Sequence, residues 1–222
     1  MYFLNRCLLV LLATCHVTAW AAVFTVDTGS DAVLSDCLQP TPADCSLRGA
    51  ILAANAMPDA DRIEFDIPDT DASYQAGTAH WRIDVSTALP NIEQTVEIDG
   101  YTQPGAVENT LAPDQGGSNA VLKIELQNAS VNPLDGLSSG NNFLALIVIR
   151  GLAIHHFTNQ IAFNSSASNR VEGCFLGTDI SGSVAANTGN NLGNGLRLLG
   201  AGDYVIGGTN PAARNVISGL NY

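Results

Sequence analysis

The chain has 222 residues, of which 46% are hydrophobic, and it carries 9 basic against 21 acidic residues, a net charge of −12. A surface this acidic repels phosphate backbones and anionic lipid headgroups, which argues against nucleic acid and membrane surfaces as partners. The length suits one domain with a substantial core, and no Ser/Pro-rich linker or block of like charge divides it.

Residues 1–21 have the features of an export signal. One basic residue, Arg6, precedes an apolar run over 7–13, which is too short to span a bilayer because that needs about 20 residues. The tripeptide AWA that ends at Ala21 has the small-x-small pattern of a signal-peptidase site, so we expect cleavage after Ala21 and export. A lipobox-like LATC ending at Cys15 and a buried N-terminal helix are the alternatives.

Three cysteines remain after this cleavage, at positions 37, 45 and 174. Cys37 and Cys45 bracket the short Pro-containing loop LQPTPAD, which in an exported chain predicts a local disulfide. Metal binding is the weaker alternative, since no second Cys or His pair stands at ligand spacing. Cys174 lies in an apolar stretch and is predicted to be a buried free thiol.

The stretch DCSLRGAILAAN, residues 44–55, predicts the first regular element after the signal, a short helix with Ser46 as its N-cap. Gly49 stands where a Glu would complete a capping box, so Gly49→Glu is expected to raise the melting temperature. The apolar residues recur at helical spacing and form one stripe: Leu47, Ala50, Ile51 and Ala54.

Beyond residue 60 the sequence becomes a series of short apolar runs broken by Gly and Asn. The run RIEFDI, residues 62–67, alternates apolar and charged residues and predicts a half-buried strand. Further predicted strands cover residues 95–99, 121–126, 143–150, 195–199 and 204–206. No helical pattern of ten or more residues lies between them.

Internal similarity relates several of these strands. NQIAF, which begins at Asn159, and NGLRL, which begins at Asn194, repeat at a lag of 35 residues. The pattern apolar-x-Gly recurs at Gly151 and Gly173 with a spacing of 22, which suits one turn of three short strands and three bends. VIGG and VISG follow at only 11 residues, so we expect them on different sides of one turn.

These spacings predict an all-β right-handed parallel β-helix in which stacked strands bury the apolar residues. A β-sandwich is the alternative, but its hairpin signals are mostly misplaced. The predicted organisation is a signal peptide over 1–21, a cap with a disulfide loop and a short α-helix over 22–61, and the β-helix over 62–222. Nothing after Gly219 could cap the last turn, so we expect truncation at the C-terminus.

Four stretches resemble a known family. DCSLRGAILAAN resembles the N-terminal motif of the bacterial CSLREA-type domain, although Gly49 replaces its Glu. IDGYTQPGA, VEGCFLGTDISG and VIGGTNPAARNVISG resemble the right-handed parallel β-helix proteins of the pectate-lyase-like fold, with Leu220 in place of an Asn. The resemblance covers nearly all of the exported chain. It implies an exported bacterial β-helix protein, but the fold hosts many activities and so implies little about this one.

Polysaccharide lyases of the fold use carboxylates that hold calcium and a basic residue that removes a proton. The apolar-x-Gly pattern offers Asp99, Arg150 and Glu172 as outward-pointing candidates. Arg150 and Glu172 are one period apart and are expected on adjacent layers, where a solvated ion pair is the simpler interpretation. Asp99 is expected two layers from Arg150, too far to complete a compact catalytic site.

The acid-rich run PDADRIEFDIPDTD could supply the two carboxyls of a glycosidase. Alternation already explains Glu64 and Asp66 as a solvent face, and the remaining acids flank turns, where Asp forms local hydrogen bonds. Adventitious calcium is the only cofactor suggested here. The remaining acids are Asp59, Asp61, Asp69 and Asp71.

Other candidate side chains have ordinary interpretations. His155 and His156 are adjacent in a strand-like stretch, so they should point to opposite faces and cannot chelate a metal together. Asp179 predicts an Asx-turn. Trp81 and Tyr101 could stack on sugar rings if exposed, but lone aromatic residues are more often packed.

No convergent catalytic set stands out, so the sequence favours a non-enzymatic binding, adhesion or structural module. We expect it to be secreted, extracellular or at the cell surface, with the periplasm as an alternative location. Extracellular polysaccharide or a cell-surface glycan is the expected partner, and no cofactor other than calcium is expected. A polysaccharide lyase or glycoside hydrolase is the alternative function.

Overall fold

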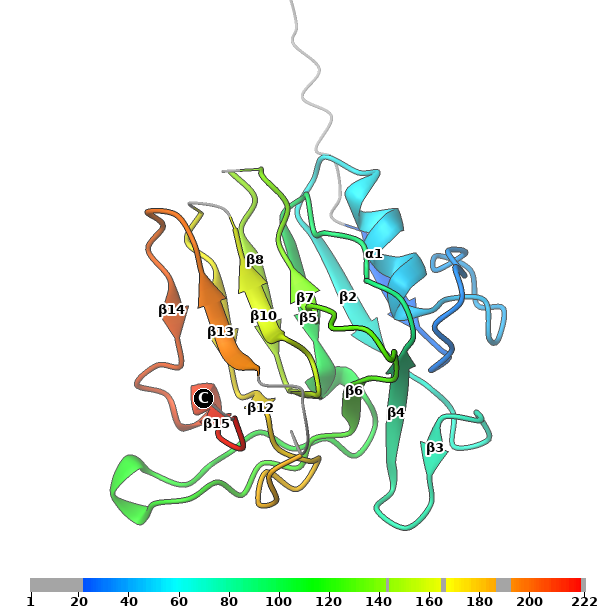
Figure 1. The fold of residues 1–222 in the computed structure, drawn as a ribbon. Helices are drawn as coiled ribbons and strands as arrows, with labels where there is room; N and C mark the ends of the chain where they lie inside the picture. The colour runs from blue at the N-terminus through cyan, green and yellow to red at the C-terminus, as the bar shows by residue number, and fades with distance from the viewer. Residues whose placement is uncertain (1–21, 143, 165–166, 187–192, 221–222) are drawn as a thin grey trace, which may run out of the picture.

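The computed structural model describes residues 22–142, 144–164, 167–186 and 193–220 (Figure 1). The predicted signal peptide and its cleavage position at Ala21 lie outside these residues. Sheet A contains β1 (Val23–Val26), β2 (Asp61–Phe65), β5 (Val96–Asp99), β8 (Ile147–Arg150), β11 (Arg170–Glu172) and β14 (Val205–Ile206). Sheet B contains β7 (Leu137–Ser138), β10 (Asn159–Phe163) and β13 (Asn194–Leu198). Sheet C contains β3 (Tyr74–Gln75), β4 (His80–Val85), β6 (Ile124–Asn128), β9 (Leu152–His155), β12 (Phe175–Leu176) and β15 (Val216–Ile217).

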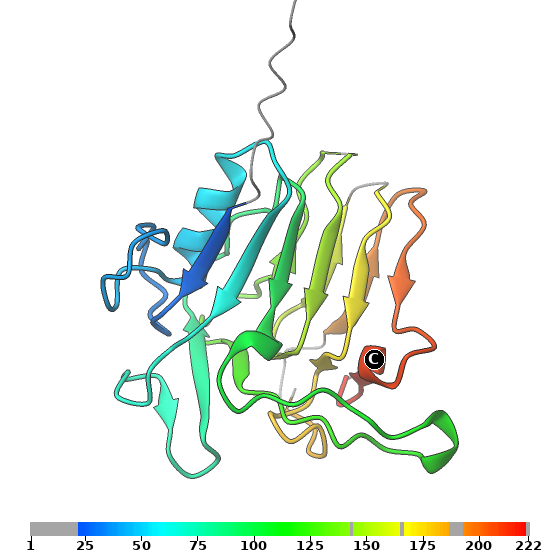
Figure 2. The same cartoon turned by 180° about the vertical axis from the view of Figure 1, so that it is seen from behind.

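Helical structure is limited to one α-helix and three short 3-10 turns in the described part of the chain. These are α1 (Leu47–Asn55) and the turns Gly100–Thr102, Pro113–Gln115 and Pro211–Ala213. From β8 onward the chain visits sheets A, C and B in rotation, so parallel neighbours within one sheet are joined through the other two. Figure 2 shows the strands of sheet A side by side.

The predicted all-β right-handed parallel β-helix is corrected by this topology. The described strands form three separate, mostly parallel sheets, and no closed or solenoid sheet occurs among them. With α1 added, the arrangement is α/β-like. The prediction treated each period as a uniform turn, whereas the real connections are irregular. Sheet B has only three described strands, β3 pairs antiparallel with β4, and residues 103–122 extend away from the sheets (Figures 1 and 2).

The core consists of aliphatic side chains that lie opposite one another on the inward faces of the sheets. In sheet A, Ile63, Ile98 and Ile149 are in register on β2, β5 and β8, and each is fully buried. Burial of each such side chain contributes about 1.5–3 kcal/mol. The repeats are confirmed where they predict register, because Asn159 lies opposite Asn194 across β10 and β13.

The first strand and α1 form one end of the structure. The helix packs against β1 and β2, and its predicted apolar stripe is buried. Ser46 is confirmed as N-cap, since its hydroxyl accepts a hydrogen bond from the Gly49 amide at 3.0 Å. The sulfur atoms of Cys37 and Cys45 lie 2.01 Å apart, at bonding distance, as the loop sequence predicts. The Cys45 carbonyl accepts from the Asp27 amide at 3.0 Å, so this loop covers the edge of β1.

Gly49 is required by packing, and the predicted benefit of Gly49→Glu is wrong. A Cβ atom at this position would lie 1.7 Å from the carbonyl oxygen of Leu34, which is backbone and cannot move aside cheaply. The helix approaches the Leu34 backbone this closely because the Ser46 amide donates to the same carbonyl at 3.0 Å. Any larger side chain at position 49 should therefore lower the melting temperature.

Candidate ligand-binding face

The outward face of sheet A brings all three candidate site residues into one row. Asp99 lies opposite Arg150 across β5 and β8, and Arg150 lies opposite Glu172 across β8 and β11. The expectation that Asp99 is two layers from Arg150 is therefore wrong. The intervening residues pass through β6 and β7 in the other two sheets, and they add no strand to sheet A.

Carboxylates surround the guanidinium groups of this row. The Arg62 Nη2 donates to Asp99 Oδ2 at 2.7 Å, and the Arg150 Nη1 lies 3.8 Å from the same oxygen. Arg150 also lies 3.7 Å from Glu97 Oε1 and pairs with Glu108. A guanidinium has five N–H donors and no acceptor atom, so Arg150, which is held by three carboxylates, is unsuited to remove a proton from a substrate.

Tyr101 contacts both Asp99 and Arg150 of this row. Its amide donates to Asp99 Oδ1 at 3.0 Å, and its hydroxyl donates to the Gly173 carbonyl at 2.9 Å. The Arg150 guanidinium lies over the ring, 5.6 Å from its centroid. Burial raises the pKa of Tyr101, so the phenol stays neutral. The ring therefore orients Arg150 and does not offer a free face for a sugar.

A hollow of about 350 Å³ opens beside β8 and β11 on this face. The Arg170 side chain, half-exposed, and Glu172 form one wall, with 3.5 Å between Nη1 and Oε1. The opposite wall is the loop around the 3-10 turn Pro211–Ala213. Donors and acceptors thus alternate along a surface that solvent can reach. The hollow is lined by Glu108, Arg150, Arg170, Glu172, Val205, Gly207, Gly208, Thr209, Asn210, Ala212 and Ala213.

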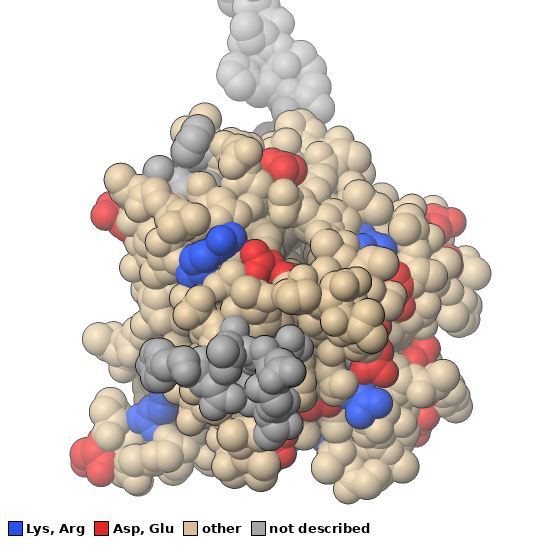
Figure 3. All heavy atoms as spheres, viewed as in Figure 1, with Lys and Arg blue, Asp and Glu red and all other residues tan. Residues whose placement is uncertain are grey.

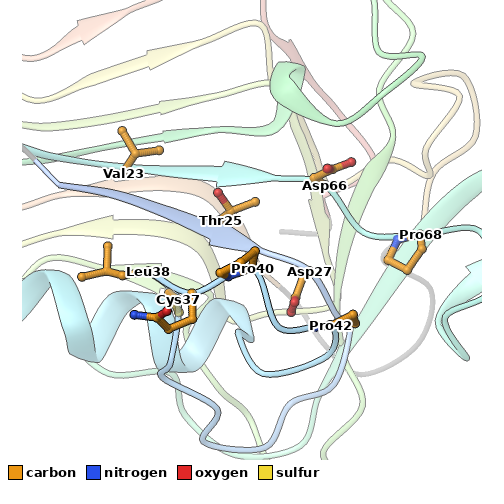
Figure 4. Close-up of a pocket in the computed structure, with 10 residues that line it drawn as sticks. Val23, Thr25, Asp27, Cys37, Leu38, Pro40, Pro42, Asp66 and Pro68 are labelled. Carbon is orange, nitrogen blue, oxygen red and sulfur yellow. The ribbon is translucent and has the colours of Figure 1, made fainter.

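A second hollow, of about 580 Å³, lies at the β1 end of sheet A (Figure 4). Val23 and Thr25 alternate with buried residues on β1 and so point to the outward side. The disulfide loop supplies Leu38 and two prolines as an apolar wall. Asp27 accepts a hydrogen bond from the Cys45 amide at 3.0 Å, which fixes the carboxylate at the rim. The outward face of sheet A is therefore hollowed at both ends.

Sheet C carries a second polar cluster that the sequence did not predict. Glu125 on β6 accepts hydrogen-bond contacts from two imidazoles, with 3.0 Å from Oε2 to His80 Nε2 and 3.1 Å from Oε1 to His155 Nε2. All three side chains are buried. Burial alone would raise the pKa of Glu125, but the bonds to His155 and His80 outweigh it and lower the pKa to about 2. The carboxylate therefore stays ionised.

The backbone at His156 extends this cluster. His156 has a φ of +66°, so the chain turns at the end of β9 and its Nδ1 lies 2.5 Å from the Nδ1 of His155. The expectation that these rings point to opposite faces is wrong, because it assumed a continued strand. Burial and the neighbouring His155 lower the pKa of His156, which favours the neutral form of its ring.

The remaining candidates have local structural contacts. Asp179 begins a turn that the Gly182 amide closes by donating to the Asp179 carbonyl at 2.9 Å, and its carboxylate accepts from the Ser181 hydroxyl at 2.6 Å in place of the backbone amide that the predicted Asx-turn requires. Trp81 is buried and its indole nitrogen donates to the Pro68 carbonyl at 2.9 Å. Cys174 is a buried free thiol, as predicted, and burial raises its pKa to about 12. Within the described ranges, no group of three or more His, Cys, Asp or Glu side chains is arranged to hold a metal ion.

On the side of the molecule that carries sheet B, a basic and an acidic side chain lie next to each other near the centre, and several acidic groups gather toward the right of the view (Figure 3). Of the helices in the described part of the chain, none has the length and apolarity needed to cross a membrane. No family model matches the chain, and neither does any curated protein or solved structure.

Proposed function

We propose that the chain is an exported binding module that holds an extracellular polysaccharide along the outward face of sheet A. The observation that carries this proposal is the row of Asp99, Arg150 and Glu172 on three adjacent strands beside an open hollow. A hydroxyl group both donates and accepts hydrogen bonds, and it therefore matches a surface where carboxylates and guanidiniums alternate.

The charge of this face favours a neutral polysaccharide over an acidic one. Carboxylates outnumber guanidiniums on it, so an anionic polymer would be repelled. The hollows at the two ends of the sheet suit an extended ligand that crosses several strands. The charged residues of the face are Glu64, Glu97, Asp99, Glu108, Glu172, Arg62, Arg150 and Arg170.

Two features support export. Arg6, the short apolar run over 7–13 and the tripeptide AWA that ends at Ala21 have the features of a signal peptide. The paired Cys37 and Cys45 suit an oxidising compartment, because cytosolic thiols are kept reduced. We place the protein outside the cytoplasm, secreted or at the cell surface.

The proposal is tested by binding to a panel of neutral and acidic polysaccharides, measured by calorimetry, with product analysis in parallel. We expect a neutral polymer to bind, and Arg170→Ala and Glu172→Ala each to weaken binding about 10-fold through lost hydrogen bonds. Arg82→Ala is the matched control, since Arg82 pairs with Asp84 on β4 of sheet C, away from the hollow. That variant should bind normally.

Two results would contradict the proposal. Equal binding by the Arg170, Glu172 and Arg82 variants would show that the polysaccharide does not bind to the outward face of sheet A. Reproducible cleavage of the polymer, lost in the Glu172 variant, would replace a binding module with an enzyme.

A further inference from the structure

Asp61 is a carboxylate in a position that the fold reserves for apolar side chains. It begins β2, where alternation places it on the inward side together with Ile63. Its neighbour across the sheet is Val96, which in turn lies opposite Ile147. Asp61 is 5% exposed, and its neighbours on β5 and β8 are the buried Val96 and Ile147.

The Asp61 carboxylate is incompletely paired. Its Oδ1 accepts a hydrogen bond from the Ala22 amide at 2.9 Å, whereas its Oδ2 is buried and accepts no hydrogen bond from any described residue. The side chain of neighbouring Arg62 is on the outward side, bound to Asp99. Burial and the nearby charge of Asp59 raise the pKa of Asp61, against the lowering effect of the Ala22 hydrogen bond. A buried carboxylate without a cation is strongly unfavourable, so this group calls for a positive partner.

We propose that Asp61 is the receptor for the N-terminus that export creates, and that the α-ammonium group of Ala22 forms a buried ion pair with its carboxylate. A signal peptidase hydrolyses the Ala21–Ala22 peptide bond with one water molecule. The hydroxyl of the water joins the Ala21 carbonyl carbon, and its hydrogen joins the Ala22 nitrogen. The amine then takes up a proton from solvent, since the ordinary pKa of an α-amino group is about 7.7–8.0.

Cleavage converts the Ala22 amide into an ammonium group whose nitrogen stays at the same position. The Ala22 nitrogen already lies 2.9 Å from Oδ1, and the ammonium carries three hydrogens in place of one. One of these can reach Oδ2, which lacks a donor in the uncleaved chain. The Ala22 carbonyl stays bonded to the Arg62 amide at 2.9 Å, so the new ion pair fastens the start of β1 to β2. Processing would thus stabilise the end of the structure on which α1 packs.

This inference rests on the export step of the proposed function but not on polysaccharide binding. The test compares a chain whose first residue is Ala22 with one that retains Ala21, both released from a removable N-terminal fusion. At pH 7 we expect the Ala22-first chain to melt about 5 °C higher. In an Asp61→Asn background the difference should shrink to about 1 °C. Equal melting temperatures, or an unchanged difference in Asp61→Asn, would overturn the proposal.

A second readout does not depend on stability. The exported chain has two amines, the Ala22 α-amine and Lys123, because Lys123 is its one lysine. Acylation by an amine-reactive ester at pH 7 is followed by mass spectrometry, with Lys123 as internal reference. We expect the α-amine to react roughly 10-fold more slowly than in the Asp61→Asn chain. A reaction rate unaffected by Asp61→Asn would refute the ion pair.

N-terminal sequencing of the naturally exported chain completes the test. A first residue of Ala22 supports the proposal, and any other first residue overturns it. Polysaccharide binding is measured on the same samples. Loss of the ion pair with binding intact, or the reverse, therefore separates a failure of this inference from a failure of the proposed function.

Discussion

On its outward face, sheet A places one carboxylate between two arginines and sheet C places one between two histidines, yet the two clusters differ in their contact with solvent. Asp99 on sheet A and Glu125 on sheet C have side chains that are 5% and 8% exposed. The partners of Asp99 are permanently charged and reach solvent, with Arg62 39% exposed. The partners of Glu125 are imidazoles and are buried, with His155 4% exposed. An outward-facing carboxylate therefore belongs to an open, charged surface in sheet A and to a buried polar cluster in sheet C.

Cover from distant segments makes this difference. On sheet C, Ala153 and Phe175 pack with Leu122 in a small apolar cluster on the outward side. Ile180, in the segment after β12, and Val216, on β15, pack against the same cluster. Sheet A keeps its hollows on the outward face. An apolar cluster thus covers part of the outward side of sheet C, whereas Arg82 and Asp84 of β4 line a separate hollow.

The largest loss of stability is expected for Glu125→Ala, in the buried cluster on sheet C. Glu125→Ala leaves the N–H groups of His80 and His155 buried without an acceptor, which should lower the free energy of unfolding by about 3–5 kcal/mol. Denaturant unfolding measures this loss, and Glu125→Gln serves as a control that keeps the shape and an acceptor. A loss below about 1 kcal/mol would mean that the cluster in sheet C is not closed.

The Glu125 carboxylate should also make the stability of the fold depend on pH in the acidic range. The folded-state pKa of Glu125 is lowered to about 2 from an ordinary 4.5, so its stabilising contribution is present above pH 4.5 and is lost as the pH falls to 2. The shift corresponds to about 3 kcal/mol. Unfolding measured from pH 6 to pH 2 should show this loss in the natural chain and a flatter profile in Glu125→Gln. Parallel profiles would contradict the assignment.

Asp99→Ala should have an intermediate effect, about 2 kcal/mol. It removes the Arg62 ion pair and the acceptor for the Tyr101 amide. The loss stays below that of Glu125→Ala, because Arg62 and Arg150 reach solvent and keep Glu97 as a partner. Melting temperatures of the two variants, measured together, test the order. A greater loss for Asp99→Ala would reverse the comparison.

Sequence patterns predict register well where the spacing between strands is regular. A lag of 22 placed Arg150 and Glu172 opposite one another, and the lag of 35 placed Asn159 opposite Asn194. Asp99 was misplaced because its distance to Arg150 in sequence includes a long excursion through the other sheets. The uniform β-helix was predicted wrongly for the same reason, because the spacing between strands does not show where a connection is irregular.

Residues whose role depends on distant cover could not be predicted from local patterns. Glu125 sits at a polar position of an alternating strand, which indicates solvent, but it is buried against His80 and His155, which are 45 and 30 residues away in sequence. His156 has a left-handed backbone conformation, which is uncommon for a residue other than glycine and cannot be predicted from a histidine in a strand-like stretch. Gly49 looked like a weakness of the helix, whereas the Leu34 carbonyl leaves room for no side chain there.

The smallest effect on stability should come from Arg170, and it tests the functional half of the comparison. Its side chain is 50% exposed and its ion pair with Glu172 is 3.5 Å long, so Arg170→Ala should change the free energy of unfolding by less than about 0.5 kcal/mol. Polysaccharide binding should nevertheless fall about 10-fold, because the guanidinium lines the hollow. Calorimetry and thermal melting on the same sample, with Arg82→Ala as control, measure both quantities. If stability falls as much as binding, Arg170 stabilises the sheet and does not contact a ligand directly. The outward face of sheet A would then have a structural role, as the cluster on sheet C has.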